Sequence, residues 1–147
     1  MKFALPLDLD HHVYRYNPCS ASKFAIYTVH GNSKSVTYTL LSIVDNPWVA
    51  TDGKMVCDPA ARLSQCDEIS ENDINHIAEH YVLLEALNGC DYLLGQNFCD
   101  NTIRTMKNAG IKIFTIPPFN SQSDKAIRHF LIGAKIADSV EYIHHAS

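Results

Sequence analysis

The sequence predicts a single α/β domain, built on a mixed sheet that has helices packed on its faces. Short runs rich in β-branched and aromatic residues fill the first third of the chain, and the second half alternates such runs with segments of helical periodicity. Strands that alternate with helices pair in parallel through right-handed crossovers. The length of 147 residues is close to the commonest size of one domain, so we expect residues 1–147 to form a single domain.

Three strands are expected in succession at the start of the chain. The apolar run at residues 2–7 predicts a buried strand, and a polar loop follows it as far as Lys23. Residues 24–29 and 36–44 favour strand, and the Gly-, Asn- and Ser-rich cluster at 31–35 separates them by a turn. These two runs therefore predict a hairpin.

An irregular connection follows at residues 45–69. It carries Cys57 and Cys66, and it contains the turn-forming pairs Asn46-Pro47, Asp52-Gly53 and Asp58-Pro59. A connection of this length inside a compact domain is uncommon and is often functional. We expect residues 46–68 to be mobile in the absence of a ligand.

The next segment predicts a helix over residues 71–87, with Ser70 as its N-cap and Asn88-Gly89 as its end. Its apolar stripe is expected at Ile74, Ile77, Ala78, Tyr81 and Leu84. His76 and His80 fall opposite that stripe, so a solvated helix face is expected there. Their separation by one turn also allows them to chelate a metal.

Two strand–helix pairs complete the prediction. Strands are expected at 91–94 and 111–116, and helices at 100–109 and 123–134. Asp100 and Ser123 are the expected helix caps, and Gly110 and Gly133 lie near the helix ends. No element is predicted for residues 140–147.

Composition narrows the possible partners and the compartment. The formal net charge is −4 and the 12 Lys and Arg residues are scattered, which argues against nucleic-acid binding. No apolar run approaches the ~20 residues of a membrane span. The apolar run at the start of the sequence is also too short for that of a signal peptide. We therefore expect a cytoplasmic protein with no membrane partner. Its 5 cysteines are then expected to be thiols rather than disulfides.

Four segments, in their order and spacing, resemble a known family. They are Lys2-Phe3-Ala4-Leu5-Pro6, Phe24-Ala25-Ile26-Tyr27-Thr28-Val29, Cys90-Asp91-Tyr92-Leu93-Leu94-Gly95 and Asn108-Ala109-Gly110-Ile111-Lys112-Ile113-Phe114. They look like the dinitrogenase iron–molybdenum cofactor biosynthesis family, with its NifX/NafY-like and NifB C-terminal domains. The resemblance implies a ribonuclease-H-like fold with a five-stranded mixed sheet in the order 3-2-1-4-5. It also implies a carrier of an iron–sulfur-based cofactor or cluster precursor, not an enzyme, that works with a cofactor-assembly or client metalloenzyme.

The sequence departs from this family in three places. Asn17-Pro18-Cys19 stands where the family has His-Phe-Gly, and Gly95-Gln96-Asn97-Phe98-Cys99 stands in place of a Gly-rich turn. The connection at 45–69 is also longer than usual. These changes remove the usual histidine ligand and add thiols, which suit iron–sulfur ligation.

In the implied strand order, strands 1 and 4 are neighbours at a switch point, where α/β sheets bind ligands beyond the strand carboxyl ends. Loops 7–23, 45–69 and 95–99 meet at that edge. Thiolates and imidazoles select soft metals and iron–sulfur clusters, so the expected ligands are Cys19, Cys99, Cys57, Cys66, His11 and His12. The alternative is that the thiols pack as small hydrophobes. Cys90 precedes strand 4, so a structural role is expected for it at the opposite edge.

Two other functions remain open. One is a metal-dependent hydrolase of ribonuclease-H type that uses Asp8 or Asp10, and the other is a zinc-stabilised interaction module. The Cys57 to Cys66 spacing matches no standard zinc motif. No Gly-x-Ser-x-Gly, Gly-x-Gly-x-x-Gly or phosphate-loop motif is present.

Overall fold

A six-stranded mixed sheet forms the centre of the computed structural model, with the strand order β5-β4-β1-β2-β3-β6. The structure describes residues 1–32, 34–47, 74–87, 89–118 and 121–140, and of 74–79 it describes the backbone only. The α/β class is confirmed. The strands are β1 (Lys2–Leu7), β2 (Lys23–Gly31), β3 (Ser35–Asp45), β4 (Tyr92–Gly95), β5 (Lys112–Thr115) and β6 (Ser139–Val140).

The sheet combines an antiparallel hairpin with parallel crossovers. The β1–β2 and β2–β3 pairs are antiparallel, which confirms the predicted hairpin, whereas β1–β4 and β4–β5 are parallel. The expected count of five strands is wrong, because β6 adds a sixth strand, parallel to the start of β3. β6 is only 2 residues long, too short for the alternating pattern by which a strand is detected in sequence.

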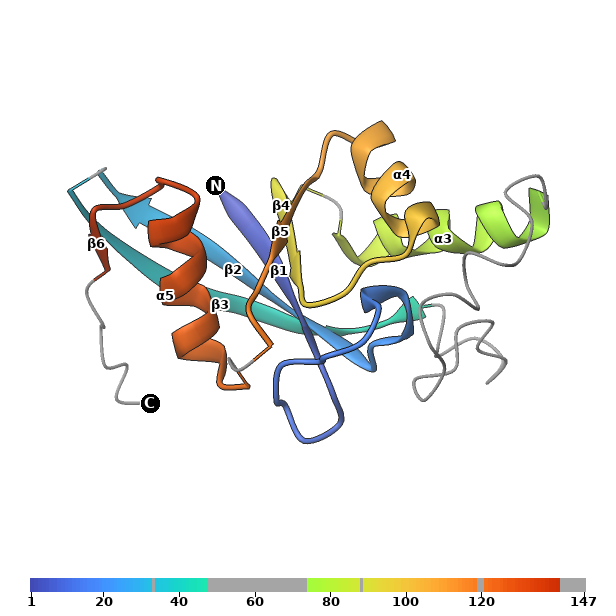
Figure 1. The fold of residues 1–147 in the computed structure, drawn as a ribbon, viewed down its shortest axis with the longest axis horizontal. Helices are drawn as coiled ribbons and strands as arrows, with labels where there is room; N and C mark the ends of the chain where they lie inside the picture. The colour runs from blue at the N-terminus through green and yellow to red at the C-terminus, as the bar shows by residue number, and fades with distance from the viewer. Residues whose placement is uncertain (33, 48–73, 88, 119–120, 141–147) are drawn as a thin grey trace.

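The helices cover opposite faces of the sheet. Along β1, Phe3, Leu5 and Leu7 join the core that includes Phe130 of α5 (Ser123–Gly133). Ala4 points to the other face, where the core is completed by α3 (Ile74–Leu87) and α4 (Asp100–Asn108). Figure 1 shows α3 and α4 close together, with α5 well apart from them.

The buried face of α3 differs from the predicted stripe. His80, Leu83 and Leu87 are each 0% exposed, whereas Tyr81 is 39% exposed. These three buried residues follow the i, i+3, i+7 spacing of one helix face. The segment 81–87 is apolar on most sides, so periodicity did not distinguish this face from its neighbour. Ser70 and the side chains of Ile74, Ile77 and Ala78 lie outside the described residues.

Two helix starts also differ by one residue from the prediction. The N-cap of α4 is Cys99 rather than Asp100, which is the first residue in the helix. The N-cap of α5 is Gln122 rather than Ser123. The shift at α4 matters most, because it puts a sulfur atom, rather than a carboxylate, at the helix N-terminus.

One edge of the sheet gathers the loops that the site needs. β1, β3 and β4 run in the same direction, so the segments after Leu7, Asp45 and Gly95 begin at one edge. Asn46, directly after β3, donates through Nδ2 to the carbonyls of Cys19 at 2.9 Å and Ala21 at 2.8 Å. The end of β3 therefore fixes the segment that carries Cys19. Among the described residues, no helix is both long and apolar enough to cross a membrane.

Candidate metal centre

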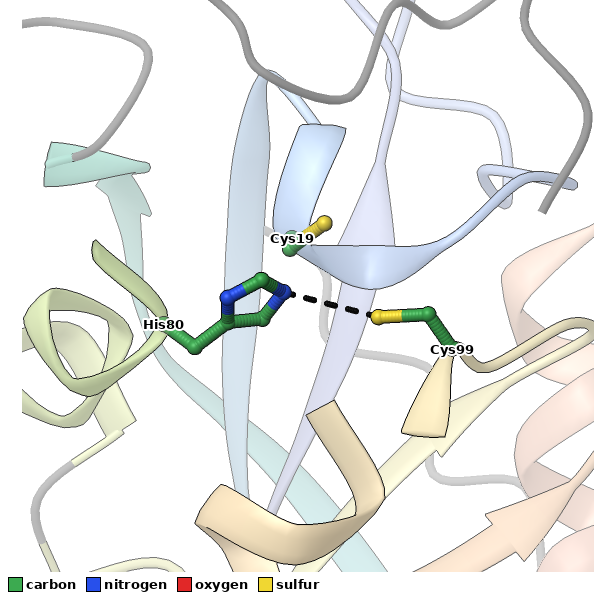
Figure 2. Close-up of side chains that lie close together, drawn as sticks. All are labelled: Cys19, His80 and Cys99. Carbon is green, nitrogen blue, oxygen red and sulfur yellow. Dashed lines mark hydrogen bonds between the residues drawn. The ribbon is translucent and has the colours of Figure 1, made fainter. Parts of the chain in front are cut away.

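Two thiols and one imidazole converge beneath the loops at this edge. Cys19 lies in the short helix η1 (Pro18–Ser20), His80 in α3, and Cys99 directly before α4. Their ligand atoms all lie within 4.8 Å of one another, and each residue is 0% exposed. Figure 2 shows how three segments distant in sequence bring these side chains together. We call this set the Cys19–His80–Cys99 group.

Local hydrogen bonds hold Cys19 in place. Pro18 begins η1, where its fixed φ suits the first helical position and its missing N–H costs nothing. The Ser20 amide donates to the Asn17 carbonyl at 3.0 Å, and the Ser20 hydroxyl donates to the same carbonyl at 2.9 Å. The Tyr14 hydroxyl lies 2.7 Å from the Ser20 hydroxyl. These bonds within residues 14–20 shape the turn that carries Cys19, and Asn46 attaches that turn to the end of β3.

Cys99 is positioned by the start of α4. Its Sγ accepts the Thr102 backbone N–H at 3.4 Å and lies 3.1 Å from the Thr102 hydroxyl. A helix N-terminus favours negative charge because the first N–H groups have no helical acceptors. The same dipole favours the thiolate form of a cysteine, which is the form that binds metals.

His80 completes the group from the opposite side. Its Nε2 lies 3.4 Å from the Cys99 Sγ, and its ring is buried on the same helix face as Leu83 and Leu87. A buried histidine on an otherwise apolar face requires a polar partner, because an unpaired ring nitrogen in the core is costly. The sulfur provides that partner, in a contact that either a hydrogen bond or a shared metal ion explains.

Asn17 connects the two thiols in a second layer. Its Nδ2 donates to the Cys19 Sγ at 2.8 Å, and its Oδ1 accepts the Cys99 backbone N–H at 3.4 Å and the Thr102 hydroxyl at 3.2 Å. Outer residues that hydrogen-bond to ligands orient them and adjust their affinity for metal. Asn17 is only 4% exposed, so these bonds form away from bulk solvent.

The donor set fits a thiophilic metal. Zinc bonds of ~2.3 Å to sulfur and ~2.0 Å to nitrogen, in tetrahedral geometry, place the two ligand atoms about 3.5 Å apart. The Cys99 Sγ to His80 Nε2 distance of 3.4 Å agrees with that value. Within the part of the chain described, the group supplies three ligands, so one position of a tetrahedral ion remains for a further ligand. The Cys19–His80–Cys99 group can therefore bind a metal ion.

The residue pattern of the sequence indicated only part of the Cys19–His80–Cys99 group. The structure brings Cys19 and Cys99 together, as expected. The expectation of a solvated face is wrong for His80, which is buried beside Cys99. The signal that was missed is the helical spacing of His80 with Leu83 and Leu87. Cys57, Cys66 and the side chain of His76 lie outside the described residues, as does nearly all of the segment expected to be mobile.

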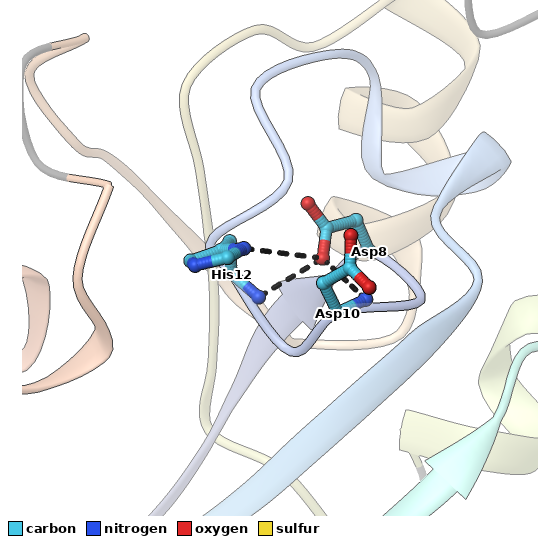
Figure 3. A network of polar contacts seen from close by, with 3 residues as sticks. All are labelled: Asp8, Asp10 and His12. Carbon is cyan, nitrogen blue, oxygen red and sulfur yellow. Dashed lines mark hydrogen bonds and ion pairs between the residues drawn. The ribbon is translucent and has the colours of Figure 1, made fainter.

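The structure does not place His11 and His12 with the thiols. Both are exposed in the turn after β1, where His12 forms a separate group with Asp8 and Asp10. In Figure 3 the Asp8 Oδ1 accepts the backbone N–H groups of Asp10 and His12, each at 2.9 Å, and lies 3.9 Å from His12 Nδ1. These bonds are those of an Asp side chain that closes its own turn, which explains the group without a metal.

Cys90 lies at the opposite edge of the sheet, before β4. It is 7% exposed, and burial raises the pKa of its thiol to about 11. The Asp91 carboxylate adds to the shift in pKa and the Lys2 ammonium opposes it. The thiol therefore stays protonated near neutral pH, and a protonated thiol is a poor metal ligand.

We expect Cys90→Ser to leave metal binding unchanged and to flatten the loss of stability at alkaline pH. The raised pKa means that the folded protein holds this proton more tightly than the unfolded chain. The contribution of the protonated Cys90 thiol to the free energy of unfolding is therefore complete below the unfolded pKa of ~8.5. It declines as the pH rises towards 11, the pKa of this thiol in the folded protein. Urea unfolding at pH 7 to 11 tests this, and a variant whose metal content drops while its circular dichroism is native would contradict the topology.

Comparisons with known proteins give a relation in fold only. No protein-family model matches the sequence, and no curated protein is similar to it. The chain is similar to a solved structure described as the crystal structure of PH0822, with a TM-score of 0.53. The similarity covers 90% of this chain and 92% of that one, at 14% sequence identity. At that identity the likeness shows that the two chains share an α/β fold.

Proposed function

We propose that this protein is a non-catalytic carrier that holds a thiophilic metal, as an iron–sulfur-based cofactor or its precursor, through Cys19, His80 and Cys99. The observation that carries the proposal is the convergence of two buried thiols and one buried imidazole from three separate segments. Such ligands select soft and borderline metals. If the cysteines were only small apolar residues of the core, nothing would require the His80 Nε2 to lie 3.4 Å from the Cys99 Sγ.

The chemistry of this site supports binding rather than catalysis. A catalytic metal needs an open position that substrate and water reach, whereas all three ligand residues are 0% exposed. The resemblance to the iron–molybdenum cofactor biosynthesis family supports the same role, and with it a ribonuclease-H-like fold and a client metalloenzyme. Cys19, Cys90 and Cys99 are all thiols, which suits the reducing cytoplasm that we propose as the compartment.

The spacing of the ligands favours a second candidate, a zinc-stabilised interaction module. Thiolates that bind different irons of one cluster lie farther apart than two ligands of a single ion. The ligand atoms of Cys19, His80 and Cys99 lie within 4.8 Å of one another, a spacing that suits a single metal ion without any movement of the chain. A cluster then requires the segments around Cys19 and Cys99 to separate, and the segment around Cys19 is tied to β3 by Asn46.

Metal analysis of protein purified without oxygen tests the proposal. A brown protein with broad visible absorption, iron and acid-labile sulfide in Cys99-dependent amounts supports the carrier. A colourless protein with one zinc per chain supports the interaction module. A protein that holds neither, and takes up neither on reconstitution with iron and sulfide or with zinc, excludes both functions for this site.

A further inference from the structure

A second candidate site lies at the same edge of the sheet as the Cys19–His80–Cys99 group, but it is formed by other residues of the loops. A pocket of about 340 Å³ opens between the loops that follow β1, β4 and β5. This is the switch point of the sheet, where β1 and β4 pair in parallel and their connections leave in different directions. Its lining includes Asp8, Tyr14, Arg15, Tyr16, Gln96 and Ser121.

The walls of the pocket combine an aromatic side with a polar side. The rings of Tyr14 and Tyr16 meet edge to face with their centroids 5.6 Å apart. Tyr14 is 7% exposed and its hydroxyl lies 2.7 Å from the Ser20 hydroxyl, whereas Tyr16 is 41% exposed. Small-molecule sites typically pair such apolar walls with a few polar groups that fix orientation. The size of this pocket lies at the lower end of their range, which suits a compact ligand.

The permanent cation in the lining of the pocket is Arg15. Within the part of the chain that the structure describes, the Arg15 guanidinium forms no ion pair, although its backbone carbonyl is held by Asn97 Nδ2 at 2.6 Å. The Asp8 carboxylate also lines the pocket and keeps its negative charge, but its Oδ1 is held in its own turn, where it accepts the backbone N–H groups of Asp10 and His12. An arginine held by its backbone with its fork of donors unused is suited to bind a carboxylate or phosphate.

The start of α5 adds to this preference. Ser121 lies two residues before the helix, and the N-cap Gln122 makes no side-chain hydrogen bond to the first turn. The N–H groups of that turn contribute positive potential on this side of the pocket, part of which Asp124 offsets. Arg15, in the loop after β1, and the start of α5, after the loop that follows β5, thus both add positive potential beside the pocket.

We propose that this pocket binds a small organic anion, with the Arg15 guanidinium on its carboxylate or phosphate group and the Tyr16 ring against its apolar body. The binding does not depend on the metal, since none of the lining residues belongs to the Cys19–His80–Cys99 group. Anion binding in this pocket is therefore a property separate from the proposed carrier function, and each can be tested without the other.

The probes are benzoate, phenyl phosphate and the neutral benzyl alcohol, titrated into ¹⁵N-labelled protein. We expect saturable shifts for the backbone signals of residues 12–16, 96 and 121 with the two anions and not with benzyl alcohol. The preference between benzoate and phenyl phosphate identifies the anionic group. Arg15→Met should weaken anion binding by about tenfold or more, the effect of losing one charge-assisted contact.

Arg128→Met is the matched control, because Arg128 is exposed on α5 and does not line the pocket. It should bind the anions as the parent does, and Cys99→Ser should also retain binding. The absence of saturable shifts at millimolar anion overturns the proposal. Equal binding by Arg15→Met with a native spectrum, or binding of benzyl alcohol as tight as that of benzoate, does so as well.

Discussion

Cys99→Ser and Cys19→Ser are each expected to lower the affinity of the protein for zinc or ferrous iron by at least about 100-fold. Loss of an outer residue that only orients a ligand costs roughly 10- to 100-fold, so loss of a direct ligand costs at least the upper value. Serine keeps the size of cysteine but does not provide a thiolate. Competition with a chromophoric chelator under anaerobic conditions measures the affinity directly.

Cys90→Ser is the matched control for these variants, since it makes the same atomic change at a buried thiol on the far edge of the sheet. Cys19 and Cys99 are both 0% exposed, so circular dichroism must show that each variant is folded before its affinity is compared. His80→Gln gives a further test from a third segment. If the two serine variants and Cys90→Ser bind metal equally well, the Cys19–His80–Cys99 group is a hydrogen-bonded cluster and not a metal site.

The elements that the sequence predicts well are those whose signal is local. The hairpin of β2 and β3 follows from β-branched runs around a turn cluster, and α4 follows from its spacing and from Gly110, whose φ of 77° only glycine adopts readily. β6 carries no such signal, because it exists only through its pairing of Ser139 with Ser35 more than 100 residues earlier. Its presence is decided by tertiary contact and not by its own residues.

The part of the candidate site that depends on strand order could be predicted from the sequence. Cys19 and Cys99 follow β1 and β4, so a parallel pairing of those strands is enough to bring them to one edge. His80 comes from a helix, where rotation by one residue changes which side chains are buried. Because Val82, Leu83, Leu84, Ala86 and Leu87 surround most of that helix, hydrophobicity alone left its rotation undetermined. A polar side chain with a function in the core is a typical place for such reasoning to fail.

The second large effect expected is a dependence of stability on metal. A ligand that binds only the folded state at 1,000 times its dissociation constant stabilises that state by about 4 kcal/mol. For a chain of 147 residues this raises the unfolding temperature by about 10 °C. The three ligands come from η1, α3 and the start of α4, so a bound ion joins segments that the unfolded chain leaves far apart.

Thermal unfolding followed by circular dichroism, with a reductant present, measures this shift in protein stripped of metal and then given zinc or ferrous iron. The parent and Cys90→Ser should gain about 10 °C, and excess chelator should reverse the gain. Cys99→Ser should gain at most about 4 °C at the same metal concentration, because a 100-fold loss of affinity leaves the metal at no more than about ten times the dissociation constant of the variant. Equal unfolding temperatures of the parent with metal and with chelator would show that the buried group stabilises the protein through its hydrogen bonds alone.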